Sequence, residues 1–318
     1  MKYCFIVNPK AGKGQSVDSV CADVKRICEE REVDYDLFVS ECIGDTKKQV
    51  AKLADEGDEV CFIACGGDGT LCETTLAVMA LPSEQRERVS VGVIPMGTGN
   101  DFASNFENKQ AFFDISAQID HTPYEIDLVK CNDMYSINMV NVGFDSHVVC
   151  QKEKIGRKKW VPRKLAYVIS LLITLIKKPG IKAELICDGE EPIHKELLLT
   201  TLANGAFCGG GFYSNPLASL TDGQVDVIAV KNVGRIKFLT LVGSYKKGVH
   251  IRDKFKKIVE NFKCRTADMY FDREMPVSID GELVSTSEIH LSIEQAALKF
   301  MLPKGATPKT KAPEVAAV

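Results

Sequence analysis

Three glycine-rich stretches in the first third of the chain contain the residue types that bind phosphate. They read NPKAGKG from Asn8, GGDGT from Gly66 and PMGTGNDFA from Pro95. Glycines allow backbone N–H groups to approach an anion closely, and threonine adds a hydroxyl donor. The first stretch is not a Walker A motif, because Gly14 and Gln15 follow its lysine where serine or threonine is required. Together, the three stretches indicate phosphate binding rather than plain turns.

Two of these stretches also contain an aspartate. Asp68 cannot bind a phosphate directly, because like charges repel, but its carboxylate could hold Mg²⁺ that bridges to a phosphate. A turn in which Asp68 caps the following helix explains the same residues. Asp101 repeats the combination of glycine, threonine and acid in the third stretch. The residues alone leave a metal site and a helix cap both open for Asp68.

The elements around the three stretches alternate between strands and helices. Apolar runs predict strands over 2–7, 35–39, 59–65 and 89–94, and apolar spacing predicts a helix with one buried face over 17–28. Such alternation implies a parallel sheet with helices on its faces. Each glycine stretch directly follows one of these strands, and ligands of such sheets bind beyond the carboxyl ends of the strands.

The second half of the chain has a different pattern, and 318 residues are more than one hydrophobic core usually fills. From about residue 123, strand-like runs follow one another, interrupted by helical patterns near 161–177 and 235–247, which favours an antiparallel sandwich or open barrel. We expect an α/β domain over 1–128 and a β-rich domain over 129–294. Residues 304–318 are rich in Pro, Ala and Lys and predict a disordered tail.

Charge and cysteine content narrow the class of protein. The net charge of −3 argues against broad nucleic-acid binding. Residues 152–182 contain ten Lys or Arg and one acid, and residues 231–265 contain eleven and two. These stretches are either solvated faces or contacts for an anionic membrane. Twelve cysteines without a CxxC pair, and a start that does not match a signal peptide, predict a reduced, cytoplasmic protein.

One apolar run, from Leu165 to Ile176, is long enough for a helix but too short to span a bilayer. It predicts a buried helix or one that dips into a membrane interface. The lysines on either side of the run fit both alternatives.

The three stretches together resemble the catalytic domain of the diacylglycerol kinase family, which includes sphingosine, ceramide and bacterial lipid kinases. The resemblance continues through IDLVKCN, NVGFD, ANGAFCGGGF, NPLASLTDGQVDV and SIDGE, and so covers nearly the whole chain. NAD kinases and phosphofructokinases share GGDG, but GTGNDFA with a late Asp-Gly-Glu is the lipid-kinase arrangement. The resemblance implies an N-terminal three-layer α/β domain with a parallel sheet and a C-terminal β-sandwich, with residues 295–303 returning to the first domain.

The resemblance also implies the residues of a site for ATP and catalytic Mg²⁺. The acids that organise the metal are Asp68, Asp101 and Asp127, and the general base is Asp280. The residues around the nucleotide are Asn8, Gly12, Gly14, Gly67, Gly69, Thr70, Thr98, Asn100 and Glu282. Without the resemblance, Asp-Gly at residue 280 is simply a strong hairpin-turn signal.

A second, structural Mg²⁺ is implied at ASLTDGQVD, where some bacterial members of the family have a metal loop. Asp222 would supply a carboxylate there, and Ser219 and Gln224 would supply backbone carbonyl groups. A plain turn at Asp222 explains the same residues.

The function implied is a kinase that moves the γ-phosphate of ATP to the hydroxyl of diacylglycerol, giving phosphatidic acid. We expect it in the cytoplasm, peripherally associated with the membrane that holds its lipid substrate, without a nucleic-acid partner. A sphingoid base, another long-chain alcohol or a small soluble molecule are alternative acceptors, and a homodimer is left open. A nucleotide-binding regulator without turnover is disfavoured, since all four catalytic acids are present.

Overall fold

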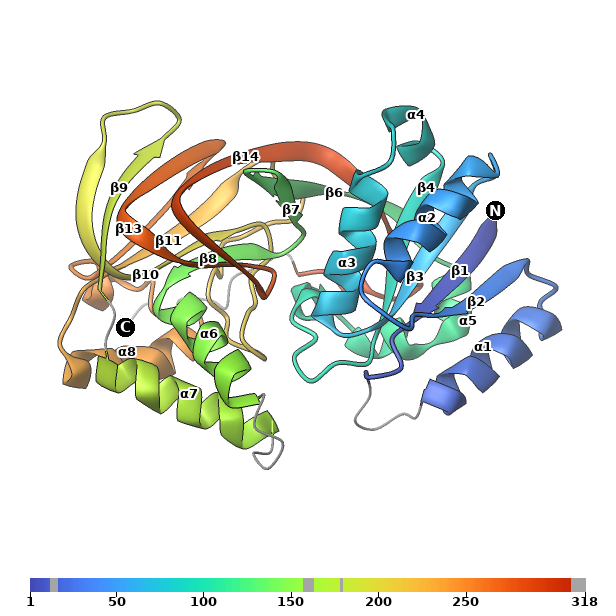
Figure 1. Cartoon of the computed structure of the whole chain (residues 1–318), viewed down its shortest axis with the longest axis horizontal. Helices are drawn as coiled ribbons and strands as arrows, with labels where there is room; N and C mark the ends of the chain where they lie inside the picture. Colours follow the sequence, from blue (N-terminus) through green and yellow to red (C-terminus); the bar gives the residue numbers. More distant parts are fainter. Residues whose placement is uncertain (12–16, 157–162, 178–179, 310–318) are drawn as a thin grey trace. The chain divides into compact units, whose positions relative to one another are not determined.

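The computed structural model of the chain describes residues 1–11, 17–156, 163–177 and 180–309 (Figure 1). The chain forms two compact units. Unit 1 comprises Met1–Leu128, Phe207–Gly211 and the C-terminal segment 295–309. Unit 2 comprises Val129–Ala206 and Phe212–Glu294. Unit 1 is therefore assembled from three separate segments, one of which comes from the middle of the second half of the sequence.

Unit 1 contains the predicted parallel sheet. Its strands β1 (Lys2–Val7), β2 (Tyr35–Val39), β3 (Val60–Gly66) and β4 (Val89–Pro95) lie in the order β4-β3-β1-β2. The end of β14 (Glu282–Leu302) adds a further parallel strand beside β4, where Phe300 lies opposite Val91. The central strands β3 and β4 are buried along their whole length, as their apolar runs predict.

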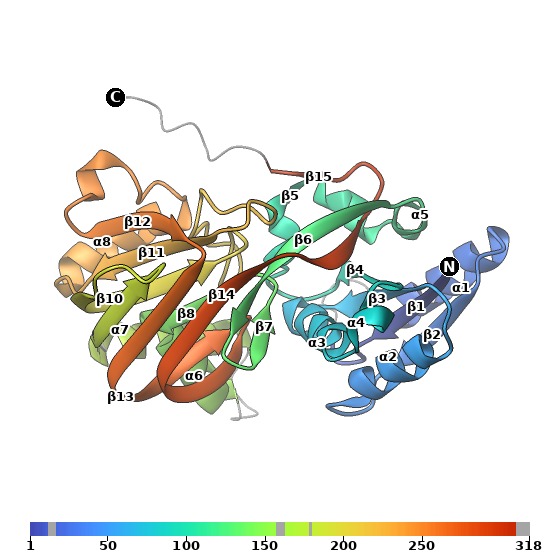
Figure 2. The ribbon, with the colours of Figure 1, turned by 90° about the horizontal axis from the view of Figure 1, so that it is seen from above.

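Helices cover both faces of this sheet, which confirms the three-layer prediction. They are α1 (Val17–Glu30), α2 (Asp45–Asp55), α3 (Asp68–Met79), α4 (Ser83–Arg86) and α5 (Ile115–Ile119). Both ribbon views place α1 and α5 on the opposite face from α2 and α3 (Figures 1 and 2). The predicted apolar face of α1 packs on β1 and β3 through residues that include Val20, Val24 and Cys28.

Four aromatic rings fill the corner where the C-terminal segment joins unit 1. Phe300 lies 5.1 Å from Phe102, 6.0 Å from Phe106 and 6.4 Å from Phe112, measured between ring centroids. All four side chains are fully buried. Phe102 belongs to the 3₁₀ helix η1 (Phe102–Asn105), Phe106 to β5 (Phe106–Glu107) and Phe112 to the 3₁₀ helix η2 (Lys109–Phe113).

Replacing Phe300 by alanine is expected to lower the free energy of unfolding by about 3–5 kcal/mol, because the ring leaves a cavity among three others. Urea unfolding followed by circular dichroism measures the change. Ile43→Ala is the control, since Ile43 is 98% exposed and its removal should change the value by less than about 0.5 kcal/mol. An equally small change for Phe300→Ala would mean that the C-terminal segment does not stabilise the unit.

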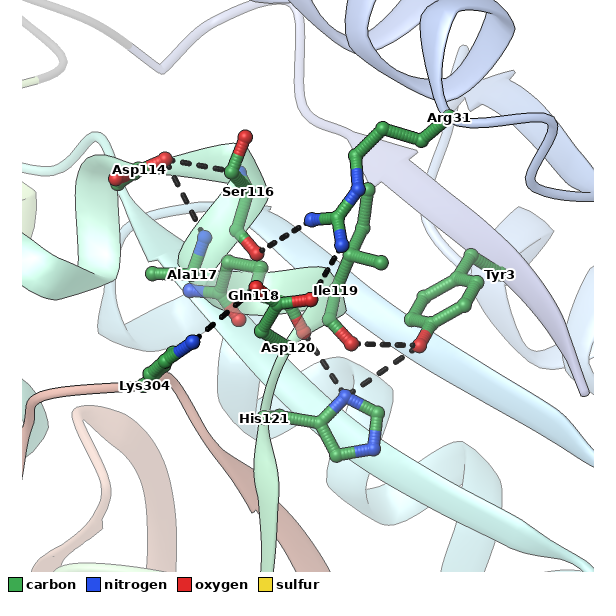
Figure 3. Close-up of polar contacts among 10 residues, drawn as sticks. All are labelled: Tyr3, Arg31, Asp114, Ser116, Ala117, Gln118, Ile119, Asp120, His121 and Lys304. Carbon is green, nitrogen blue, oxygen red and sulfur yellow. Dashed lines mark hydrogen bonds and ion pairs between the residues drawn. The ribbon is translucent and has the colours of Figure 1, made fainter.

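A polar cluster shows how the segment after β14 is held to unit 1 (Figure 3). The Asp120 carboxylate lies 2.5 Å from the Arg31 guanidinium and 3.7 Å from the Lys304 ammonium. The Lys304 backbone N–H also donates to the Ala117 carbonyl, and β15 (Thr307–Pro308) pairs with β5. The prediction of a disordered tail from residue 304 is therefore wrong for residues 304–309. Its remaining part, 310–318, lies outside the described residues.

Unit 2 is the β-rich part of the chain. Its strands are β6 (Thr122–Cys131, which begins in unit 1), β7 (Met134–Ser136), β8 (Met139–Gly143), β9 (Ile181–Cys187), β10 (Ile193–Ala203), β11 (Val225–Lys231), β12 (Val259–Cys264), β13 (Thr266–Ile279) and most of β14. Both β8 and β9 pair antiparallel with β10 and with β13, at opposite ends of those strands. This double bridging closes the sheet around an apolar core, as the sandwich prediction requires.

Three α-helices of unit 2 pack on β10 and β11, and they are followed by the 3₁₀ helix η3 (Asp253–Phe255). They are α6 (Phe144–Gly156), α7 (Arg163–Lys177) and α8 (Arg235–Lys246). The sequence predicts α7 and α8 but not α6, which begins directly after β8. Among the described residues, no helix is long and apolar enough to cross a membrane.

Candidate active site

The GGDGT and PMGTGNDFA stretches form two touching loops at the carboxyl ends of β3 and β4. A Cβ on Gly97 would lie 2.6 Å from the Gly67 Cα, and a Cβ on Gly66 would lie 2.1 Å from the Thr70 hydroxyl oxygen. A side chain at Gly97 would push the two backbones apart, and one at Gly66 would collide with the Thr70 side chain, so both positions require glycine. The two loops therefore act as one rigid edge of unit 1.

Asp68 and Asp101 point their carboxylates at the same place in this edge. A Cβ on Gly99 would lie 3.2 Å from the Asp68 Oδ2 and 3.3 Å from the Asp101 Oδ2. Asp68 is the first residue of α3, but its Oδ1 accepts the backbone N–H of Phe102 at 3.0 Å, and no side chain caps the helix. Of the two alternatives for Asp68, the helix cap is therefore wrong.

Asp101 is almost fully buried and is held by two glycines. Its carboxylate accepts the backbone N–H of Gly210 at 2.9 Å and that of Gly211 at 2.8 Å. Burial, with the nearby charge of Asp68 as the next cause, raises the pKa of Asp101 to about 6, although the two amides oppose this rise. The carboxylates of this edge therefore carry more negative charge than their hydrogen bonds stabilise. A bound cation would compensate that charge.

Mg²⁺ fits this arrangement. The ion prefers oxygen ligands and in kinases is usually held by one or two carboxylates together with substrate phosphates and water. Asp68 and Asp101 supply two converging carboxylates. The described residues contain no group of three or more His, Cys, Asp and Glu side chains that could hold a metal without other ligands. An ion here would therefore need oxygen atoms from a bound phosphate or from water.

Gly210 and Gly211 are site residues that the sequence analysis misses. Both have positive φ angles, 82° and 105°, which favour glycine, and both aim their N–H groups at Asp101. The only signal in the sequence is the run of three glycines from Gly209, which stands far from the other loops along the chain. Nothing local in that run indicates that it belongs to unit 1.

The remaining predicted nucleotide residues of unit 1 behave in different ways. The Asn8 side-chain amide donates to the Thr70 hydroxyl at 3.1 Å, which joins the first loop to the second. Asn100 has a φ of 54° and bonds its own loop, accepting from the Gly97 N–H and donating to the Pro95 carbonyl. It therefore positions that loop. Thr98 is exposed, and Gly69 has no neighbour that a Cβ would touch.

Gly12 and Gly14 lie outside the described residues. The Asp127 carboxylate, on β6, accepts the backbone N–H of Ala296 at 2.9 Å and so ties β6 to the end of β14. Its role toward Mg²⁺ stays a prediction.

In unit 2, Asp280 lies in a tight hairpin turn between β13 and β14. Asp280 and Gly281 have φ angles of 47° and 96°, and Ile279 pairs with Glu282 across the turn. The hairpin prediction is confirmed, because both central residues have the positive φ of a type I′ turn. Glu282 is exposed on the β14 side.

The Asp280 carboxylate does not point to solvent but accepts four hydrogen bonds. Its Oδ1 accepts from the Ser136 hydroxyl at 2.8 Å and from the backbone N–H groups of Asn138 and Met139 at 3.1 and 2.9 Å. From the described residues, its Oδ2 accepts one hydrogen bond, from the Ile137 N–H at 2.7 Å. Burial raises the pKa of Asp280 to about 6 against these donors, so the group is a stronger base than an ordinary carboxylate.

The predicted structural metal loop is a turn closed by an ion pair. The Asp222 carboxylate accepts the Gln224 N–H at 3.1 Å, and its other oxygen lies 2.5 Å from the Lys263 ammonium. A lysine therefore already neutralises the one carboxylate of the loop, and with Ser219 and Gln224 offering only backbone carbonyls, the loop does not fit a Mg²⁺ site.

We expect any difference in unfolding temperature between EDTA and millimolar Mg²⁺ to be the same for the nucleotide-free wild type and for Asp222→Asn, because a ligand stabilises only the state that binds it and the Asp222 loop is expected to bind none. Differential scanning fluorimetry is sufficient to measure this. An unfolding temperature that is higher in Mg²⁺ for the wild type but not for Asp222→Asn would show that the ion displaces Lys263 and binds the loop.

Family models match almost the whole chain. The diacylglycerol kinase catalytic domain matches residues 2–131, and the YegS C-terminal NAD kinase beta sandwich-like domain matches residues 138–302. The chain belongs to the diacylglycerol kinase family. This assignment to a family of lipid kinases confirms the resemblance in the glycine stretches and the SIDGE motif.

Individual members of the family align over most of their length. The "Diacylglycerol kinase" of Mycobacterium tuberculosis is 28% identical over 315 residues, covering 95% of this chain and 96% of that protein. The "Probable lipid kinase YegS-like" of Stenotrophomonas maltophilia is 28% identical over 271 residues, covering 82% and 84%. A crystal structure of a diacylglycerol kinase from Bacillus anthracis shares the fold, with a TM-score of 0.70 at 21% identity over 95% of this chain and 97% of that one.

Proposed function

We propose that the protein transfers the γ-phosphate of ATP to the free hydroxyl of diacylglycerol, giving phosphatidic acid and ADP. The observation that carries the proposal is the convergence of Asp68 and Asp101 at an edge built from two glycine loops. A relative named diacylglycerol kinase, aligned over 95% of this chain, supports this choice of acceptor.

Unit 1 is proposed to bind the nucleotide phosphates. Its loops offer backbone N–H groups, and the amino end of the twelve-residue helix α3 favours negative charge. Because the Thr70 hydroxyl accepts from Asn8, its proton is free to donate to a phosphate oxygen. Mg²⁺, when bound by Asp68 and Asp101, neutralises charge on the phosphates as the reaction proceeds.

Unit 2 is proposed to activate the acceptor through Asp280. Its Oδ2 receives a single hydrogen bond and so retains room to accept the proton of the lipid hydroxyl. As that proton moves to Asp280, the lipid oxygen bonds to the γ-phosphorus, the bond from phosphorus to the β–γ bridging oxygen breaks, and ADP leaves. With a pKa of about 6, Asp280 is mostly ionised at neutral pH and yet basic enough to take the proton.

The test is transfer of label from γ-labelled ATP to vesicles that contain diacylglycerol, sphingosine, ceramide or phosphatidylglycerol. We expect label in diacylglycerol that disappears in Asp280→Asn and persists in Asp253→Asn, an exposed acid of unit 2. Label in sphingosine or ceramide alone would mean that the acceptor is a long-chain alcohol of that kind and not diacylglycerol. Label in none of the lipids, from protein shown to bind ATP, would overturn the proposal.

A further inference from the structure

Helix α7 places apolar side chains on its outer face and hydroxyls on its inner face. Leu172 and Ile176, one helical turn apart, are 52% and 69% exposed. Ser170 and Thr174, in contrast, are buried, beside Leu171 and Leu175, which pack on the core. A helix that faced only water would have the opposite arrangement, with its polar side chains outside. The outer face of α7 is therefore suited to an apolar environment.

Helix α8 continues this apolar surface. Ile236 is 83% exposed and Leu239 is 57% exposed, whereas Phe238 and Leu241 of the same helix are buried. The Arg235 guanidinium donates to the Ile176 carbonyl at 2.8 Å, so the end of α7 lies against the start of α8. Figure 1 shows the two helices side by side beneath the strands of unit 2. We call the four exposed residues Leu172, Ile176, Ile236 and Leu239 the α7–α8 surface.

The charged residues of α7 and α8 are all of one sign. The sequences of α7 and α8 contain no Asp or Glu, and their basic residues are Arg163, Lys164, Lys177, Arg235, Lys237 and Lys246. Among the basic residues of the two helices whose side chains the structure describes, Lys177, Arg235, Lys237 and Lys246, none has an acidic partner within ion-pair distance. Lysine and arginine around an exposed apolar stripe are the pattern of a helix that lies in the plane of a membrane interface.

We propose that the α7–α8 surface docks the protein on an anionic lipid bilayer. The inference rests on the proposed function, since an enzyme that phosphorylates diacylglycerol must reach a lipid held in a bilayer. A second copy of the chain is the less suitable partner, because a two-fold contact through this surface would oppose basic residues to basic residues. An anionic bilayer matches both properties, with acyl chains for the isoleucines and leucines and negative headgroups for the lysines.

Vesicle flotation without ATP or diacylglycerol tests docking separately from catalysis. The wild-type protein is expected to float with phosphatidylcholine vesicles that contain phosphatidylglycerol and to stay behind with phosphatidylcholine alone. Lys177→Gln with Lys237→Gln should weaken binding about fivefold for each lysine at low salt. Ile176→Gln with Ile236→Gln should weaken it roughly tenfold or more, because less apolar area enters the interface. Lys48→Gln and Ile43→Gln, exposed residues of unit 1, are the matched controls.

Turnover of a short-chain diacylglycerol, monomeric in water, separates the two proposals. Both α7–α8 variants should match the wild type on this acceptor and lose activity only on vesicles. Asp280→Asn should fail on both acceptors. Undiminished flotation of both variants would overturn the docking proposal. So would a wild-type dimer in light scattering that Ile176→Gln with Ile236→Gln converts to monomer, since the surface would then bind a second copy.

Discussion

Asp280→Asn is expected to lower kcat by about 10²–10⁴-fold while leaving the KM for ATP nearly unchanged, because a positioned general base acts in the chemical step. The asparagine oxygen can still accept the three hydrogen bonds that Oδ1 now accepts, from Ser136, Asn138 and Met139. Its amide nitrogen would face the Ile137 N–H and lose that one bond. Steady-state kinetics and a melting curve on the same preparation separate lost chemistry from lost structure.

The pH dependence gives a second readout for Asp280. Because the base acts only when ionised, kcat/KM should be constant well above its pKa of about 6 and fall at least tenfold for each pH unit below it, and more steeply where Asp101 is protonated as well. The groups that face Asp280 are a hydroxyl and three backbone amides, none of them charged. Ser136→Ala removes a hydrogen-bond donor that favours the ionised carboxylate, so the pKa of Asp280 should rise. The fall of kcat/KM on the acid side of the pH profile should then begin at a higher pH. The pKa of Asp101 is also raised to about 6, but the causes of that rise are its burial and the charge of Asp68, which Ser136→Ala leaves unchanged.

The assignment of Asp280 as base would be wrong if Asp280→Asn retained near wild-type kcat. It would also fail if Asp280→Asn lost activity only in proportion to folded protein, since the carboxylate would then merely hold the segment 136–139. If Ser136→Ala did not change the pH at which kcat/KM falls, a group other than Asp280 would be the one that titrates.

Asp101→Asn is expected to lower kcat by roughly 10²–10³-fold, since it removes one of two converging charges from the site where phosphate charge must be neutralised. The asparagine oxygen can still accept from Gly210 and Gly211, so the loop should keep its shape. The Mg²⁺ concentration that gives half-maximal activity should rise as well. Kinetics over a Mg²⁺ titration measure both effects.

Asp18→Asn, which changes an exposed acid on α1, is the control for this variant and should behave as the wild type. If Asp101→Asn needed no more Mg²⁺ than the wild type, the ion would lie elsewhere. A further variant, Gly210→Ala, tests the support of Asp101 instead, because its φ of 82° strains any side chain. It should lower activity less than Asp101→Asn does.

The strands of unit 1 could be predicted almost residue by residue, and those of unit 2 less well. β1 and β2 have the predicted bounds because each is an apolar run that ends at a turn. The residues ADMYFD and MPVSI are separated by charged residues and yet belong to one strand, β13, with a shift of register between Tyr270 and Met275. Helix α6 is missed because its first residues continue the apolar run of β8. Gly143, with a φ of 92°, is the signal that ends that strand.

The site residues that belong to one glycine loop could be predicted from the sequence. Those that reach the site from a distant segment of the chain could not. Asp68 and Asp101 belong to glycine loops, and the sheet edge brings them together as the parallel topology requires. Gly210 and Gly211 reach Asp101 across more than a hundred positions of sequence, so no local pattern reports the contact. For Asp280, the turn and the buried carboxylate are both present, and the turn is what aims the side chain at residues 136–139.

The division of unit 1 into three segments sets the order in which the newborn chain can become active. The first 128 residues contain the three glycine-rich stretches, but not Gly210, Gly211 or the end of β14 that pairs with β4. The edge of β4 stays open and the aromatic corner lacks a ring until Phe300 has been added. An incomplete or truncated product of translation therefore lacks the support of Asp101.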